Sequence, residues 1–276
     1  YPLVWKVLPL SRYLFCFMCM MIVLLSTYNG EAYLAEQLES LLHQKGVTIR
    51  ILIRDDGSCD STVEIVKHWQ SKYPQIIDFV QGTNVGFAMS FTYLLQIAVR
   101  QYPEATYYAF CDQDDVWLPE KLQKAVEQLD VESKDIPVAY CSNTRLVDKN
   151  LQFIRMCWGK NEVHLSKERA LIQNFATGCT MVFNHKAAEI YVSHQPEVIK
   201  VHDFLMYQLC MFLGKVIYDE NSYILYRQHG NNQIGRPGFC QRWKRRWTTQ
   251  NYKKRTLEIQ NYCFLKAYKD LLDVDD

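Results

Sequence analysis

The sequence lacks the two glycine-rich loops that hold phosphates in the commonest nucleotide-binding folds. Its 276 residues include only 11 glycines, and neither G-x-G-x-x-G nor G-x-x-x-x-G-K-[ST] occurs. The first absence excludes a Rossmann dehydrogenase, and the second excludes a P-loop enzyme, because each fold depends on its loop to cradle phosphate groups. A nucleotide-binding site in this chain therefore has to be built in another way.

A strong net charge and long apolar runs are also missing. Lys and Arg total 31 against 30 for Asp and Glu, a net charge of +1, so any attraction to a membrane must come from a local patch. A broad basic surface for nucleic acid is absent, and we expect no nucleic-acid partner. The apolar run at residues 14–25 is shorter than the roughly 20 residues of a membrane-spanning helix. We expect a cytoplasmic protein whose first buried strand spans residues 21–26, preceded by an N-terminal extension or fragment end at residues 1–20.

The ten cysteines do not form a recognisable metal or disulfide pattern. Most lie singly inside apolar runs, and only Cys16 and Cys19 are close in sequence, with no matching Cys or His pair nearby. A structural zinc site requires four ligands. We therefore predict buried, reduced thiols.

Short apolar strands alternate with amphipathic helices through the first half of the chain. The predicted strands span residues 22–25, 47–53, 76–80, 107–111 and 138–141. The predicted helices span residues 31–44, 61–72, 86–100 and 119–129, and Ser61 with Glu64 fits a capping box. This alternation predicts an α/β fold with a mostly parallel central sheet flanked by helices.

Polar clusters follow three of the predicted strands, at the sheet edge where ligands of such folds bind. The clusters are Thr27 to Asn29, Asp55 to Ser58 and Asp112 to Asp115. Carboxylates two residues apart after a strand suit Mg²⁺ or Mn²⁺, which take a few carboxylates together with substrate phosphates. The alternative is an acidic loop before the helix near residue 119. The Asp55–Asp56 pair could bind a base or ribose, or could simply form a turn.

Four motifs, taken together, resemble family 2 glycosyltransferases of the GT-A fold, and most closely their rhamnosyltransferase-like branch. They are LLSTYNGE at 24–31, RDDGSCDST at 54–62, NVGFAMSF at 84–91 and CDQDDVWLPEKL at 111–122. The resemblance extends from about residue 21 to about residue 235. Its motifs are specific for the family and carry little information about the sugar.

The resemblance implies a role for each matching position on the donor side. Thr27 and Tyr28 would line the nucleobase pocket, and Asp55 or Asp56 would hold the base or ribose. Asn84 and Gly86 would lie near the donor. Asp112 and Asp114 would bind the metal and, through it, the diphosphate, with Asp115 as a neighbour.

Three later motifs resemble the acceptor side of the same family. NFATGCTMVFN at 174–184 is similar to its acceptor strand, which implicates Thr177 and Gly178. VHDF at 201–204 implicates His202 in the acceptor site and Asp203 as catalytic base, although Asp203 alone could be a helix cap. YRQHGNN at 226–232 implies that Arg227 and His229 contact the diphosphate; a purely structural role is equally compatible for His229.

The resemblance implies inverting transfer of a sugar, with rhamnose as a candidate, from a UDP- or dTDP-linked donor. The acceptor would be a hydroxyl of a glycan or lipid-linked molecule in cell-surface polysaccharide synthesis. Two alternatives are a sugar nucleotidyltransferase, which would need a basic glycine-rich loop after the first strand, and a non-catalytic glycan-binding module of the same fold.

The predicted domains are a catalytic domain at residues 21–236, with donor (21–142) and acceptor (143–236) halves, and a helical tail at 237–276. The tail begins with a basic and aromatic stretch, residues 242–255. We expect this stretch either to contact the inner face of the cell membrane or to pack on the domain.

Overall fold

The computed structural model describes residues 20–229 and 242–272. It describes the side chains of all these residues except 242–254. Residues 1–19 of the predicted N-terminal extension and the domain boundary near Pro237 lie outside these residues, whereas Met20 already belongs to the first strand. All seven cysteines in the described part of the chain are free; five are buried as predicted, but Cys59 is exposed and Cys157 is half-buried.

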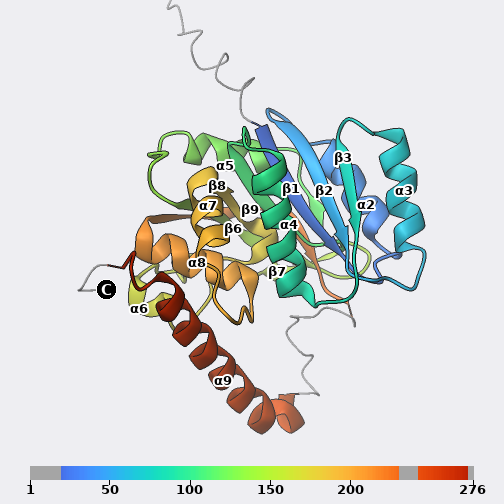
Figure 1. The fold of residues 1–276 in the computed structure, drawn as a ribbon. Helices are drawn as coiled ribbons and strands as arrows, with labels where there is room; N and C mark the ends of the chain where they lie inside the picture. The colour runs from blue at the N-terminus through green and yellow to red at the C-terminus, as the bar shows by residue number, and fades with distance from the viewer. Residues whose placement is uncertain (1–19, 230–241, 273–276) are drawn as a thin grey trace, which may run out of the picture.

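A nine-stranded sheet forms the centre of the molecule, and its first half is parallel (Figure 1). Strands β3 (Ile77–Gln81), β2 (Thr48–Asp55), β1 (Met20–Thr27) and β4 (Tyr107–Cys111) lie side by side in that order. All three pairings are parallel, so the carboxyl ends of these strands meet at one edge. The α/β fold class is confirmed.

The second half of the sheet is mixed. Strand β8 (Val182–Asn184) runs antiparallel to β4 and to β6 (Val138–Val147). Strand β9 (Lys215–Arg227) is parallel to β6 and antiparallel to β5 (Val116–Trp117), and β7 (Phe153–Met156) is antiparallel to β6. Strand β6 extends six residues beyond the predicted segment, because its polar second half still pairs with β7 and β9.

Helices cover both faces because alternate residues of β1 belong to two separate cores. Ile22 and Leu24 enter the core under α4 (Phe87–Gln101), α7 (His185–Ser193) and α8 (His202–Leu213). Val23 enters the core under α2 (Leu34–Leu42) and α5 (Lys121–Leu129), near α3 (Thr62–Lys72). A short helix, α6 (Lys167–Ala170), and a 3-10 turn, Gly178–Thr180, lie in the chain between β7 and β8.

The predicted capping box at the start of α3 is wrong. Ser61 is the N-cap residue but makes no side-chain cap hydrogen bond. Asp60 instead accepts from the backbone N–H of Thr62 at 3.0 Å, and Glu31 accepts from the N–H of Ser61 at 3.0 Å. The backbone N–H groups at the start of α3 are thus satisfied by the residue before the N-cap and by the loop that follows β1.

The C-terminal helix α9 (Arg242–Tyr268) docks on the domain through its second half, and its first half extends away from the sheet (Figure 1). Phe264 is fully buried, with its ring 5.3 Å from that of Phe212 in α8. Gln260 accepts from the N–H of Lys200, and Asn261 accepts from Gln208. Within the described residues, no helix combines the length and apolarity needed to cross a bilayer.

We predict that the docked half of α9 contributes to the stability of the domain. Phe264→Ala should lower the free energy of unfolding by about 3–5 kcal/mol, because it removes a fully buried aromatic ring. Tyr262→Ala is the matched control on the same helix: its side chain is 65% exposed and its loss should cost within about 0.5 kcal/mol. Urea denaturation would measure both, and equally small effects would contradict the docking.

Candidate active site at the carboxyl edge of the sheet

The loops after β1, β2 and β4 meet the second half of the catalytic region around one pocket of about 710 Å³. Most of the predicted site residues contribute to its wall. From the first half of the chain these are Tyr28, Asp56, Asn84, Gly86, Asp112 and Asp114; from the second half they are Thr177, Gly178, His202, Asp203 and His229. Thr27, Asp55 and Arg227 are not among the residues that line it.

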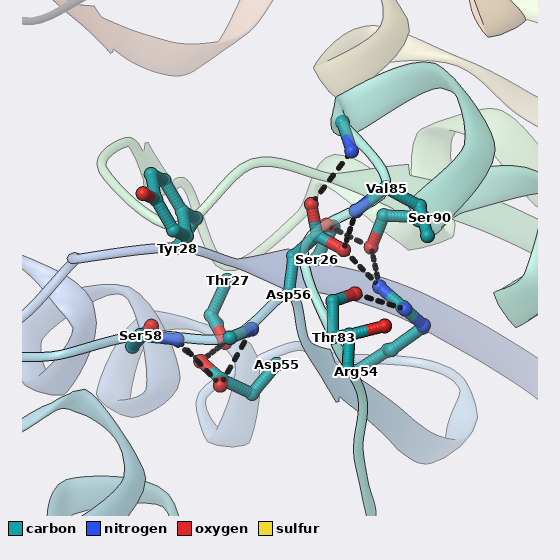
Figure 2. Close-up of polar contacts among 12 residues, drawn as sticks. Ser26, Thr27, Tyr28, Arg54, Asp55, Asp56, Ser58, Thr83, Val85 and Ser90 are labelled. Carbon is teal, nitrogen blue, oxygen red and sulfur yellow. Dashed lines mark hydrogen bonds and ion pairs between the residues drawn. The ribbon is translucent and has the colours of Figure 1, made fainter.

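Asp55 builds the loop after β2 (Figure 2). Its carboxylate is fully buried and accepts from the hydroxyls of Thr27 and Ser58 and from the N–H groups of Gly57 and Ser58. A carboxylate has about four acceptor positions, so these bonds use its whole capacity. Thr27 is itself 1% exposed, and its hydroxyl ties the end of β1 to this loop.

Asp56 points the other way and lines the pocket. Its Oδ1 accepts from Arg54 at 2.6 Å and from the N–H of Val85 at 2.9 Å, and its Oδ2 accepts from the N–H of Gly86 at 2.9 Å. Gly86 has φ +83°, a backbone conformation that favours glycine. One acceptor position of Oδ2 is left for a ligand.

Arg54 forms an ion pair with Asp56, as Figure 2 shows. Its guanidinium is almost completely buried and also donates to the hydroxyl of Ser90 and to the carbonyl of Thr83. The positive charge of Arg54 stabilises the buried carboxylate of Asp56, and the oxygens of Ser90 and Thr83 accept its remaining hydrogen bonds. The network therefore fixes Asp56 in one orientation.

Tyr28 is 41% exposed and forms the outer wall of the donor side. Its backbone is clamped by the side-chain amide of Gln113, which accepts from the N–H of Tyr28 at 2.8 Å and donates to its carbonyl at 3.0 Å. Gln113 lies between Asp112 and Asp114, so it ties the loop after β1 to the acidic loop after β4.

The acidic loop brings several carboxylates close together. Burial and the negative charges of Asp114 and Asp203 raise the pKa of Asp112 to about 8. Asp114 Oδ2 lies 2.8 Å from Nε2 of His229, whose ring packs against Tyr33. Asp112 and Asp114 both face the pocket.

Asp115 turns inward, away from the pocket. It is fully buried, and its Oδ1 accepts from the N–H of Arg227 at 3.1 Å. Ligand atoms of Asp112, Asp115 and Cys179 lie within 4.8 Å of one another, a spacing that could hold a metal ion. Burial raises the pKa of the Cys179 thiol well above its usual value, which disfavours the thiolate that a metal requires.

Arg227 supports the acidic loop from the end of β9. The residue is 2% exposed, and its guanidinium donates to the carbonyls of Asp114 and Lys149, each at 2.8 Å, and pairs with Glu36. Its guanidinium carbon also lies 4.5 Å from the centre of the Tyr33 ring. These contacts occupy Arg227 inside the protein, beneath the loop whose carboxylates face the pocket.

Asp203 lies in the first turn of α8 and faces the pocket. One oxygen accepts from the N–H of Gly178 at 2.7 Å and the other from Nδ2 of Asn174 at 3.2 Å. Burial raises the pKa of Asp203 to about 6, and the hydrogen bonds it accepts oppose that rise. A Cβ atom at Gly178 would lie 3.0 Å from Asp203 Oδ2, so this position favours glycine.

His202 lies beside Asp203 with its ring stacked on Phe91, at 4.0 Å between centroids. Sequence reasoning missed Asn174, Gln113 and the aromatic floor under His202. Asn174 opens one of the motifs and Gln113 lies inside another, but their contacts join segments 29 and 85 residues apart, which no local pattern reports.

Comparisons with known proteins show the family to which the chain belongs. Residues 22–190 match the family model described as glycosyl transferase family 2. A dTDP-rhamnosyl transferase of Shigella flexneri, RfbG, is 31% identical over 86% of this chain and 83% of its own length. An uncharacterised protein of Mycobacterium tuberculosis, Rv1520, is 26% identical over 74% of this chain and 58% of its own.

Solved structures show the same fold at low sequence identity. Staphylococcus aureus TarS in complex with UDP-GlcNAc superposes with a TM-score of 0.57 and 16% identity, covering 93% of this chain and 77% of TarS. The Pyrobaculum calidifontis mannosyltransferase PcManGT, in complex with GDP-Man and Mn²⁺, has a TM-score of 0.56 and 16% identity, covering 97% of this chain and 84% of its own. With the family model and a relative above 30% identity, the chain belongs to glycosyl transferase family 2 and is a glycosyltransferase with a GT-A-like fold.

Proposed function

We propose that this enzyme transfers a sugar, with rhamnose as the first candidate, from a nucleotide diphosphate donor to a hydroxyl of a glycan or lipid-linked acceptor, with inversion. The observation that carries the proposal is that one pocket holds two pocket-facing carboxylates after β4 together with Asp203. Burial, with the charges of Asp114 and Asp203, raises the pKa of Asp112. The name of the 31% identical relative supports rhamnose and a thymine nucleotide.

Asp56 is the residue we assign to the nucleobase. Thymine and uracil both present an imide N–H, and Oδ2 of Asp56 keeps one acceptor position facing the pocket. Arg54 and two backbone N–H groups hold that carboxylate in place. Tyr28 would form the adjoining wall, and Asn84 and Gly86 would lie beside the ribose.

The pocket fits a divalent cation. Its described lining includes the carboxylates Asp56, Asp112, Asp114 and Asp203 but no Lys or Arg side chain. Without a cation, a diphosphate would meet these acidic side chains and no Lys or Arg side chain of the described lining. Oxygen ligands of this kind suit Mg²⁺ or Mn²⁺. When bound by Asp112 and Asp114, such an ion would supply the positive charge that stabilises the departing diphosphate.

Asp203 is the proposed catalytic base. It would accept the proton of the acceptor hydroxyl while that oxygen attacks the anomeric carbon and the bond to the diphosphate oxygen breaks on the opposite face. The pKa of about 6 leaves the carboxylate ionised at neutral pH yet basic enough to share a proton. Thr177 and Gly178, whose N–H holds Asp203, would form the wall next to the acceptor.

We predict that Asp203→Asn lowers kcat by about 10²–10⁴-fold, because it removes the base while keeping the shape of the side chain. The wild-type rate should fall as pH drops below about 6, because Asp203 becomes protonated there. Transfer rates from pH 5 to 8 would test both effects, with nucleotide affinity as the internal control. The assignment would be refuted if the variant kept full turnover, or if its rate fell at low pH in the same way as that of the wild type.

A second prediction concerns the metal. Asp114→Ala should abolish the Mn²⁺-dependent part of nucleotide binding, because it removes a pocket-facing oxygen ligand. Calorimetry with dTDP, in the presence and absence of Mn²⁺, would measure it. Glu127→Ala is the matched control, since it removes an equal charge from an exposed position of α5 outside the pocket. Equal Mn²⁺ dependence in both variants would count against the metal role.

The basic stretch at residues 242–255 is proposed to contact an anionic membrane at its cytoplasmic face, where a lipid-linked acceptor would be found. Each basic residue near such a surface contributes about 1 kcal/mol. We expect the protein to float with liposomes containing anionic lipid and to be released by salt, whereas replacement of Arg242, Lys244, Arg245 and Arg246 by Gln should weaken flotation. Absence of salt-sensitive flotation would end this part of the proposal.

A further inference from the structure

His202 carries hydrogen-bonding groups that the rest of the described protein leaves unused. The residue is 5% exposed, and neither Nδ1 nor Nε2 has a hydrogen-bond partner in the described part of the chain. Buried polar groups are nearly always paired, because they lose their water on folding. His202 nevertheless lines the pocket, and because both nitrogens are covered by neighbouring atoms, a ligand would meet them only after a small shift of the pocket wall.

Aromatic side chains hold the imidazole in one position. Phe91 stacks on the ring at 4.0 Å and 18°, Phe110 meets it edge-on at 4.7 Å and 89°, and Phe87 lies 6.0 Å away. Burial lowers the pKa of His202 to about 3, so the ring stays neutral at physiological pH. A neutral imidazole offers one N–H donor and one acceptor nitrogen, which is the complement of a hydroxyl group.

The position of His202 indicates which hydroxyl it can meet. A Cβ atom at Gly178 would lie 3.3 Å from His202 Nε2 and 3.0 Å from Asp203 Oδ2, so both atoms flank the same small space. On its other side the ring packs against Phe110, which precedes Asp112 by two residues. A transferred sugar must lie between a diphosphate at Asp112 and an attacking hydroxyl at Asp203, and His202 lies beside that path.

We propose that His202 hydrogen-bonds a hydroxyl of the transferred sugar and holds the sugar ring between the departing diphosphate and Asp203. The inference rests on the proposed function and adds a specific sugar contact to it. The ligand is the hexose unit of the nucleotide sugar. Phe87 and Phe91, which also line the pocket, offer its apolar face a floor.

His202→Phe separates this role from a structural one, because it keeps an aromatic ring and removes both nitrogens. The variant without ligand should gain about 2–6 °C in Tm, since two unpaired buried groups disappear. Its affinity for dTDP with Mn²⁺ should not change. Its affinity for the tightest binder among dTDP-L-rhamnose, UDP-glucose and GDP-mannose should fall roughly 3–10-fold, and hydrolysis of that donor should slow by a similar factor.

Two further variants provide controls. His202→Gln restores a donor and an acceptor and should recover most of the sugar affinity. Tyr207→Phe removes another buried, unpaired hydroxyl from α8 at a position outside the pocket. It should raise Tm in the same way and leave the affinity for nucleotide sugars unchanged.

The possible outcomes separate the inference from the proposed function. Two results would overturn the role of His202. One is a lower Tm for His202→Phe than for the wild type; the other is a ratio of nucleotide-sugar affinity to nucleotide affinity that equals the wild-type ratio for all three donors. Failure of the wild type to bind any nucleotide with Mn²⁺ would instead refute the proposed function, and the change in Tm would still decide whether the imidazole nitrogens are unpaired.

Discussion

Crowded negative charge at the carboxyl edge of the sheet is the constraint on which the site depends. Asp112, Asp114 and Asp203 all face one pocket, and burial together with the charges of the other two raises the pKa of Asp112 to about 8. Such crowding costs free energy, so the rest of the fold must hold the carboxylates where they are. Arg227 does so, through the carbonyl of Asp114 and the carboxylate of Asp115. A cation bound between these carboxylates would relieve the repulsion that the fold tolerates without it.

In the loops after β2 and β4, one of two adjacent Asp residues is buried and the other faces the pocket. Asp55 and Asp115 are fully buried and hold backbone N–H groups, while Asp56 and Asp114 face the pocket. Successive residues on an extended segment point in opposite directions, so one of each pair must turn inward. An inward carboxylate that accepts backbone donors makes the outward one rigid, and a rigid carboxylate loses less entropy on binding a ligand.

Local patterns predicted the parallel half of the sheet because each of its strands is a short apolar run closed by a polar loop. β4 begins and ends at the predicted residues. The acceptor half was not predictable in this way: β5 has two residues and β8 three, and both exist through pairing with distant strands. The same limit applies to the site. Motifs identified Asp56, Asp112 and Asp203, whereas the inward turn of Asp55 and Arg227 depends on contacts that local sequence does not encode.

One wall of the pocket is completed by a helix that lies beyond the matched family region of residues 22–190. Leu257 of α9 lines the same pocket as Asp203, and Gln260 and Phe264, one and two turns further on, dock the helix on the domain. A side chain at the pocket wall is only as well placed as the element that carries it. The buried contacts of α9 therefore position this part of the pocket wall. The basic stretch of the sequence at residues 242–255 begins the same helix, so one helix joins it to the pocket.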